Sequence, residues 1–226
     1  MRNSLTNSFI SLLILLNSTI ISAGDEFIVD KNSLVDNKPI NDYVNSWWQW
    51  AVSMSSSLSP VKDTTGQFCH INQKGKVWFL SGGYGTSKIK RKCSIPKDKL
   101  IFFPVINMLH YPSALSKPSC KSVKQSASIN NQFLISFKVE VDGQKYLNPA
   151  LHRYGSVECF DLIKLQKSNL NASQIFPSAT DGYWIMLNPL SKGKHSIAFH
   201  AEYHNPNNAY GTMIQDIEYD IEIYEP

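Results

Sequence analysis

The sequence predicts a mainly β protein: an antiparallel β-sandwich or jelly roll with one N-terminal amphipathic helix packed on it. Two observations predict this fold, and a third predicts export. Short segments of alternating apolar and polar residues, divided by Gly, Pro and Asn, fill most of the chain after Pro60. Helical periodicity is confined to about residues 40–58. Four cysteines follow an apolar N-terminal segment, which is typical of exported domains with disulfides. Residues 24–226 have the length of a single domain.

The N-terminal segment has the order of a secretory signal peptide. Arg2 precedes an apolar run that begins at Phe9, and small residues follow it around Ala23. Polar residues at 17–19 interrupt the run, so it suits a permanent span of about 20 apolar residues poorly. We therefore expect a signal peptide over residues 1–23 and a secreted or periplasmic protein with no stable membrane span after cleavage. An uncleaved anchor is the alternative.

The predicted helix carries an apolar stripe centred on Trp47. At about 100° per residue, Trp48 and Trp50 fall on the two flanks of the stripe and Gln49 falls outside it. A run of serines at 55–57 weakens the helix, and Pro60 ends it. Because the stripe is wide enough to dock on a core, we expect Trp47 to be buried. The other residues that cluster about it are Ile40, Val44, Ala51, Met54 and Leu58.

The clearest strand signal is a hairpin. Residues 133–141 alternate between apolar and polar, Asp142-Gly143 follows, and residues 144–146 return, with Gly accepting the positive φ of the turn. Residues 217–223 alternate with acidic residues, which predicts a solvated acidic face that guards a sheet edge. The segment 112–132 is rich in Ser, Lys and Asn and is predicted to be a long surface loop. Further strands are expected at 77–80, 100–103, 183–187 and 196–203.

The even cysteine count predicts two disulfides. Three pairings are possible, and we favour Cys69–Cys93 with Cys120–Cys159 because each closes a local loop. A zinc site is the alternative, but it needs close pairs such as C-x-x-C, which this sequence lacks.

The charge pattern argues against a nucleic-acid partner. The formal net charge is only +4, and no nucleic-acid-binding motif accompanies it. Lys88, Lys90, Arg91 and Lys92 form a short basic cluster, for which a solvated loop is the simplest interpretation.

Several motifs together cover most of the chain after residue 23. They are Trp47-Trp48-Gln49-Trp50; Asp63-Thr64-Thr65-Gly66 with Cys69 and Gln73; Val77-Trp78-Phe79-Leu80 with Gly82 and Gly85; Cys93-Ser94-Ile95-Pro96; Ile101-Phe102-Phe103-Pro104 with Asn107; Val141-Asp142-Gly143; Asp181-Gly182-Tyr183-Trp184; and Pro189-Leu190 with Gly193 and His195. This set resembles a family of secreted bacterial proteins without a characterised activity. The resemblance implies a shared all-β sandwich fold and gives no activity to transfer.

One motif invites comparison with aspartic proteases. Asp63-Thr64-Thr65-Gly66 is similar to their D-T-G, but it has an extra residue and no second copy, whereas the chemistry needs two carboxylates that share a proton. A turn stabilised by the Asp63 side chain is the better interpretation. The sequence contains no G-x-S-x-G, H-E-x-x-H or P-loop motif.

One strand presents candidate metal ligands. Residues two apart in a strand share a face, so His200, Glu202 and His204 point the same way, opposite the apolar Phe199 and Tyr203. Two imidazoles and a carboxylate suit zinc or another transition metal. An exposed polar strand face is the alternative interpretation. We expect no other cofactor.

Aromatic side chains give the other lead. Exposed Trp and Tyr rings stack on the apolar faces of sugar rings, and the candidates here are Trp48, Trp50 and Tyr84. The alternative is that the tryptophans fill the core. We expect a secreted, non-enzymatic binding protein for a glycan, a cell-envelope component or another protein. The runner-up is a secreted hydrolase or metalloenzyme that uses the face formed by His200, Glu202 and His204.

Overall fold

A computed structural model describes residues 27–85, 87–113, 115–164, 175–207 and 211–226. The predicted signal peptide, residues 1–23, lies outside the described residues. None of the helices in the described segments is long and apolar enough to span a membrane.

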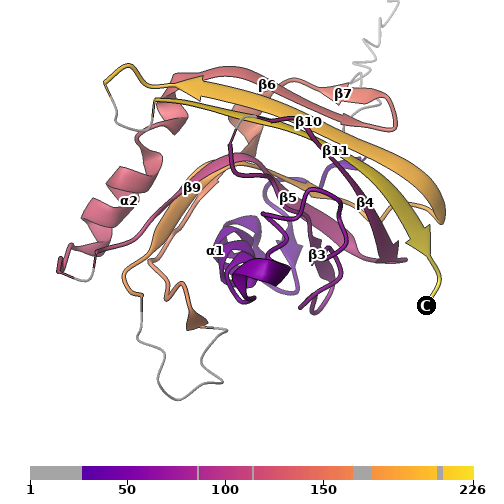
Figure 1. Ribbon diagram of the computed structural model, residues 1–226, viewed down its shortest axis with the longest axis horizontal. Coiled ribbons are helices and arrows are strands. Elements are labelled where there is room, and N and C mark those ends of the chain that lie inside the picture. Colours follow the sequence, from indigo (N-terminus) through magenta and orange to yellow (C-terminus); the bar gives the residue numbers. More distant parts are fainter. Residues whose placement is uncertain (1–26, 86, 114, 165–174, 208–210) are drawn as a thin grey trace, which may run out of the picture.

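The described chain is mainly β and forms two sheets that face each other (Figure 1). The five-stranded sheet has the order β4 (Ile89–Pro96), β11 (Thr212–Tyr224), β10 (Gly193–His204), β6 (Leu134–Val141) and β7 (Gln144–Tyr146). The four-stranded sheet has the order β3 (Val77–Phe79), β5 (Leu100–His110), β9 (Ala179–Leu187) and β8 (Arg153–Gly155). A separate ribbon joins β1 (Leu34–Val35) to β2 (Lys38–Pro39). Short 3₁₀ turns occur at Ser56–Leu58, Asn131–Phe133 and Pro149–His152.

The predicted antiparallel sandwich is correct only in part, because both sheets are mixed. Strand β4 pairs with β11 in parallel, and β3 pairs with β5 in parallel. The other pairings are antiparallel, including the predicted hairpin of β6 and β7. At its turn Asp142 and Gly143 adopt φ values of 50° and 83°, the left-handed conformations that a two-residue hairpin turn requires.

The main core lies between the two sheets. Side chains from β5 and β9 meet those from β10 and β11, and the rings of Phe103 and Phe199 stack across the interface with centroids 4.9 Å apart. Ile185 and Tyr203 are fully buried in the same cluster. The alternating apolar residues of β10 and β11 therefore face the core, as the sequence predicts.

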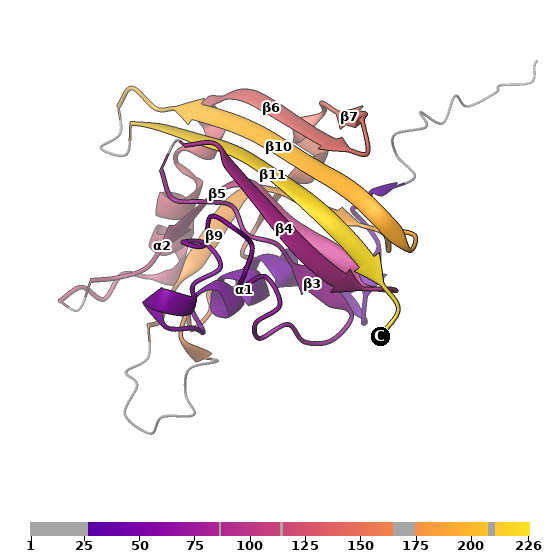
Figure 2. The same cartoon turned by 45° about the vertical axis from the view of Figure 1, so that its right-hand side comes forward.

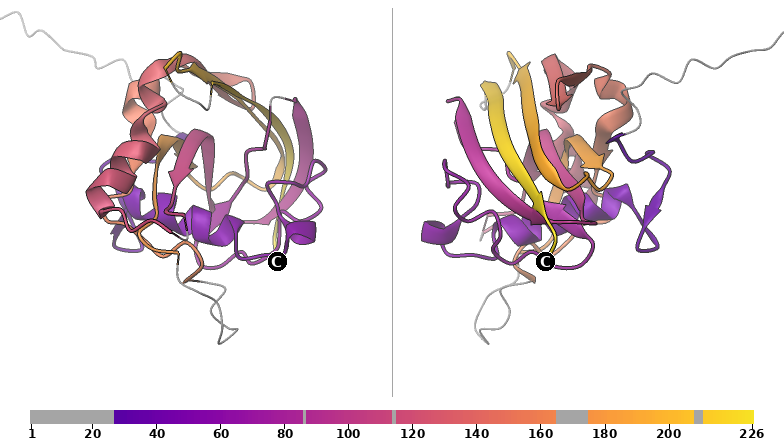
Figure 3. Two further views of the ribbon diagram at one scale, coloured as in Figure 1. Left: turned by 60° about the vertical axis from the view of Figure 1, so that its left-hand side comes forward. Right: turned by 90° about the vertical axis from the view of Figure 1, so that its right-hand side faces the viewer.

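Helix α1 (Ile40–Ala51) covers the other face of the four-stranded sheet, so the molecule has three layers (Figure 3). Trp47 is 2% exposed and packs edge-on against Trp184, which confirms the predicted phase of the helix. The helix ends seven residues before the predicted end at Leu58. The Ser53 hydroxyl donates to the Trp50 carbonyl, and this competing bond helps to stop the helix.

A second helix, α2 (Cys120–Ser128), replaces part of the predicted loop over 112–132. The Ser119 side chain accepts a hydrogen bond from Ser122 N and so caps its first turn. Val123 and Ala127, four residues apart, are buried against β9. A short apolar pair within a polar segment gives too weak a periodic signal to be found in the sequence alone.

The predicted edge position of the last strand is wrong. Strand β11 lies between β4 and β10, side by side with both in Figure 2, and its acidic residues face the lysines of β4. Lys88 Nζ lies 2.6 Å from Glu218 and Lys90 Nζ lies 3.2 Å from Asp220. The predicted basic loop is thus mostly an edge strand with a lysine face, and such exposed pairs contribute about 0.2–1 kcal/mol each.

The cysteines pair as predicted, Cys69 with Cys93 and Cys120 with Cys159. The first disulfide fastens the loop before β3 to β4, and the second fastens α2 to the segment after β8. Each disulfide therefore joins an irregular or helical segment to another part of the fold.

Candidate functional site

The site begins with an irregular, buried segment after β3. Backbone groups of Leu80 to Gly83 are hydrogen-bonded by side chains: Trp47 Nε1 donates to the Leu80 carbonyl at 2.8 Å, and Arg91 Nη1 donates to the Ser81 carbonyl at 2.9 Å. The Gln215 carboxamide pairs with both Gly83 backbone groups, at 2.8 and 2.9 Å. Because buried backbone groups need partners, these side chains let the segment leave the sheet.

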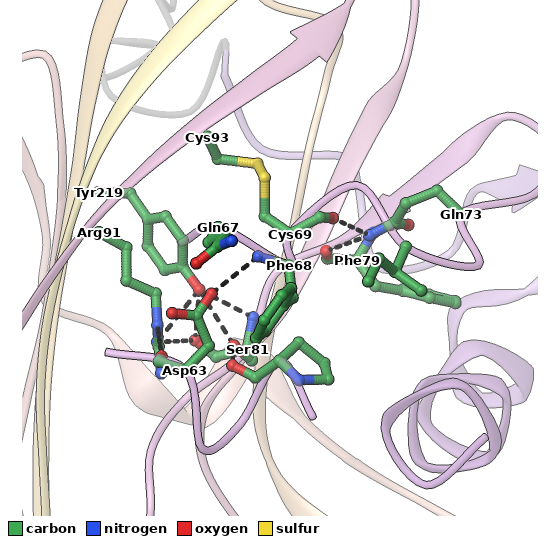
Figure 4. Close-up of a disulfide and its surroundings, with 12 residues drawn as sticks. Asp63, Gln67, Phe68, Cys69, Gln73, Phe79, Ser81, Arg91, Cys93 and Tyr219 are labelled. Carbon is green, nitrogen blue, oxygen red and sulfur yellow. Dashed lines mark hydrogen bonds between the residues drawn. A yellow bond between two sulfur atoms is a disulfide. The ribbon is translucent and has the colours of Figure 1, made fainter. Parts of the chain in front are cut away.

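The Asp63 turn lies next to this segment, and Figure 4 shows it beside Arg91 and Tyr219. Asp63 Oδ1 accepts hydrogen bonds from the Thr65 backbone and hydroxyl, and Oδ2 accepts from Phe68 N. Gly66 adopts a φ of +89°, and a Cβ there would lie within 2.0 Å of the Lys92 carbonyl. The motif is therefore a turn that is stabilised by the Asp63 side chain and packs on β4, as the sequence predicts.

Beside the irregular segment lies a small apolar hollow, which we call the Trp48–Tyr84 hollow. It has a cavity volume of about 50 Å³ and is bounded by α1, the segment after β3, β5 and the start of β11. Its lining residues are Trp47, Trp48, Val61, Gly82, Gly83, Tyr84, Pro104, Val105, Ile106, Asn107, Met213 and Gln215.

The structure brings two of the three predicted ligand-binding aromatics together here. Trp48 is partly buried and donates through Nε1 to the Thr180 hydroxyl at 2.9 Å, which fixes its ring. Tyr84 is 61% exposed at the rim. Partial desolvation and the nearby Tyr111 raise the pKa of Tyr84 above its ordinary value. The prediction that Trp50 is an exposed platform is wrong: it is 2% exposed and donates to the Ile71 carbonyl.

Asn107 is the site residue whose role sequence reasoning missed. It follows a register shift in β5 between Pro104 and Ile106, and it lies opposite Gly182, where a Cβ would come within 2.4 Å of the Asn107 Cβ. Asn107 Oδ1 is buried and has no hydrogen-bond partner among the described residues. An asparagine within the apolar run of residues 100–109 was the signal that could have identified it.

The predicted metal ligands share the outer face of β10, as expected from their spacing. In the register, His200 lies opposite Asp216 of β11 and Lys138 of β6. His204 Nδ1 lies 2.6 Å from the Thr212 hydroxyl. Across the described segments, no three His, Cys, Asp or Glu side chains form a group that could hold a metal ion.

His195 lies between Asp142 and Ser191, the residue types of a Ser-His-Asp catalytic triad. Its Nδ1 lies 2.6 Å from Asp142 Oδ2, and its Nε2 lies 3.5 Å from the Ser191 hydroxyl but only 2.8 Å from the Ser191 carbonyl. Because Nε2 must donate to that carbonyl, it is not placed to take a proton from the hydroxyl. The arrangement fastens the loop before β10 to the β6–β7 turn.

A larger, more polar hollow of about 460 Å³ lies between α2 and strands β8 and β9. Burial raises the pKa of Asp181, and the nearby Arg153, whose Nε lies 3.0 Å from Oδ1, opposes this shift. Lys124 Nζ donates to the Val157 carbonyl at 2.6 Å. These charged groups already have partners within the fold, whereas Asn107 Oδ1 has none in the part of the chain that the structure describes.

Comparison with models of known protein families finds none that matches this chain, and no matching sequence is found among curated proteins. The geometry of the site must therefore carry the functional argument.

Proposed function

We propose that this chain is an exported, non-enzymatic binding protein that holds a neutral group of a glycan in the Trp48–Tyr84 hollow. A cell-envelope component or a protein that presents a similar group is the alternative ligand. The proposed export rests on the signal-like N-terminus, and the two disulfides are compatible with it.

The carboxamide of Asn107 is the observation that carries the proposal. A buried carbonyl oxygen without a partner costs about 1–3 kcal/mol. Such groups are uncommon in folded proteins, and each asks for an explanation. A ligand group that enters the hollow and donates a hydrogen bond to Asn107 Oδ1 recovers this cost, and Nδ2 of the same carboxamide is a further donor.

The rest of the lining supports binding of a neutral group. The indole of Trp48 and the exposed phenol of Tyr84 provide faces for C–H groups, and Gln215 is already engaged with Gly83. No Asp, Glu, Lys, Arg or His is found among the described residues that line the hollow. Apolar walls with a few polar groups are the usual composition of small-ligand sites.

A glycan array and tryptophan fluorescence test the proposal. Ligand in the hollow contacts Trp48, so binding shifts or quenches the emission of the protein. Tyr84→Ala is expected to weaken binding about tenfold or more, because stacking on one exposed ring contributes about 1–2 kcal/mol. Tyr224→Ala is the matched control, since that tyrosine is 40% exposed but lies at the other end of β11 from Met213. An array without hits, or equal loss in both variants, contradicts the proposal.

The second candidate function is a hydrolase or metalloenzyme that uses His200, Glu202 and His204. The observation in its favour is that all three lie on one strand with Phe199, Ala201 and Tyr203 buried on the opposite face. Zinc that stays bound to dialysed protein and is lost in His200→Ala would support this candidate.

A further inference from the structure

We infer that the group held in the Trp48–Tyr84 hollow is an acetamido group, so that the ligand is an N-acetylated sugar. This inference rests on the proposed function and specifies its ligand class. It follows from the size of the hollow, its walls, its aromatic rim and the Oδ1 atom of Asn107, which has no partner among the described residues.

The size of the hollow excludes a whole sugar ring. A site needs about 10–15 Å³ of such volume for each water-sized group. The cavity volume of about 50 Å³ therefore has room for a few heavy atoms. The methyl, carbonyl and N–H of an acetamido group fill a space of this size, while the pyranose ring stays outside.

The walls match the two ends of an acetamido group. Val61, Val105 and Ile106 give apolar contacts for a methyl group. Asn107 Oδ1 can accept a hydrogen bond from the acetamido N–H, and with the carboxamide turned over, Nδ2 would instead donate to the acetamido carbonyl. Neither an ammonium nor a carboxylate would find a charged partner among the described lining residues.

The protein already uses carboxamide side chains to bind peptide groups. Gln73 pairs with both backbone groups of Phe79, at 2.8 and 2.9 Å, and Gln215 does the same with Gly83. Asn107 presents the same chemical group in the hollow that Gln215 also lines, but the described chain supplies no peptide group for its Oδ1. An acetamido group is a peptide group that a ligand can bring.

The rim of the hollow suits the sugar ring that carries this group. Tyr84 is 61% exposed and Tyr111 is 50% exposed, and the two phenols lie close enough for Tyr111 to influence the pKa of Tyr84. An exposed aromatic face stacks on the C–H face of a pyranose. The acetamido group would then enter the hollow while its ring rests at Tyr84.

Three oligosaccharides of equal length separate the inference from the proposed function. β-1,4-linked oligomers of N-acetylglucosamine, glucosamine and glucose differ only in the group at C2, which is acetamido, ammonium or hydroxyl. In calorimetric titration of the protein, the acetylated oligomer is expected to bind at least about tenfold more tightly than the other two. One net hydrogen bond and one buried methyl group contribute enough free energy for this difference. Equal binding of the acetylated and glucose oligomers overturns the inference but leaves the proposed function in place. If neither these oligomers nor any glycan on the array binds, both are wrong.

Variants at two positions assign the preference to the hollow. Asn107→Leu and Asn107→Ala are expected to reduce the preference for the acetylated oligomer to less than about threefold, because the hydrogen bond is lost. Tyr84→Ala weakens binding of all the oligomers that bind and leaves the preference unchanged. Gln144→Ala, at an exposed carboxamide on β7, is the control. A preference that survives both Asn107 variants overturns the inference.

The melting temperature distinguishes a binding role of Asn107 from a structural one. Removing a buried carbonyl that has no partner does not break a hydrogen bond of the free protein, so Asn107→Leu is expected to melt at or above the wild-type temperature. A variant that melts well below wild type would show that the carboxamide holds the fold together, and the inference would fail.

Discussion

The guanidinium of Arg91 lies over the ring of Tyr219, 5.5 Å from its centroid, and Nη1 donates to the Tyr219 hydroxyl at 3.1 Å. Arg91 is 1% exposed. Its other hydrogen bonds go to the backbone carbonyls of Val61, Asp63, Ser81 and Gly82. The charge is therefore solvated by peptide oxygens, and the residue ties the Asp63 turn and the segment after β3 to the five-stranded sheet (Figure 4).

We expect Arg91→Lys to destabilise the protein by at least about 3 kcal/mol, because an ammonium cannot reach all of these carbonyls in the fork geometry of a guanidinium. Urea denaturation followed by circular dichroism measures the change. Lys90→Arg, at an exposed position of the same strand, is the control and is expected to be neutral. If Arg91→Lys unfolds at the same urea concentration as wild type, the role assigned to the guanidinium is wrong.

Trp47→Ala is expected to cost about 3–5 kcal/mol, because it empties the centre of the α1 core and removes the hydrogen bond to Leu80. Gln49→Ala should cost only about 1 kcal/mol. The position of Gln49 outside the stripe suggests that its removal has no effect on stability. In the structure, however, Nε2 donates to the Asp161 carbonyl at 2.9 Å, so the substitution removes a hydrogen bond. Thermal unfolding of both variants gives the comparison, and similar losses would show that Trp47 is not the anchor of the helix.

The Asp63 turn should make stability depend on pH. Partial burial would raise the pKa of Asp63, but hydrogen bonds from Phe68 and Thr65 together hold it below its ordinary value. The contribution of the carboxylate is therefore fully present above about pH 4 and is lost as the pH falls further, through the pKa of the folded state. Asp63→Ala is expected to be about 2 kcal/mol less stable than wild type at pH 7. This difference in the free energy of unfolding should become smaller below about pH 4. A difference in the free energy of unfolding that stays constant from pH 7 to pH 3 would contradict this account.

Zinc binding on β10 is tested by metal analysis. If His200, Glu202 and His204 hold zinc, dialysed protein should retain about one equivalent, and His200→Ala should lose it. His70→Ala, at an exposed histidine of the loop before β3, is the control. Metal-free protein whose melting temperature does not respond to added zinc would end this hypothesis.

The mainly β character, both disulfides, the β6–β7 hairpin and the burial of Trp47 could be predicted because each rests on local information. Alternation of residues reports which face of a strand is buried, and a left-handed turn needs Gly or Asn or Asp. Cysteine spacing favours the short loops that formed here.

The neighbours of the strands could not be predicted in the same way. Alternating acids on β11 indicate an exposed face, but they do not say whether another strand lies beside it, and the lysines of β4 that pair with them are more than 100 residues away. In the sequence, Arg91 looked like one member of a basic cluster. Its burial depends on carbonyls from two separate segments, at Val61 and Asp63 and at Ser81 and Gly82, and the sequence does not show that these segments meet it.

The candidate site was predicted in part. Trp48 and Tyr84 line one hollow, and their binding role stays a prediction. Trp50 is buried in the core because the stripe of α1 is wider than the sequence indicated. Asn107 was noted only as part of a motif. Its lack of a partner is a property of the assembled sheet and is not visible in the sequence.

The carboxamide of Gln73 closes an edge of the four-stranded sheet. Its bonds to the Phe79 N–H and carbonyl occupy the positions that an incoming strand would use, so β3 is not open there to pairing with another copy of the chain. Deamidation of Gln73 to glutamate would place a carboxylate against the carbonyls of Cys69 and Phe79, which now accept from Nε2. An ageing sample in which this side chain has hydrolysed would then expose the edge, and self-association through β3 would follow from a change of one atom.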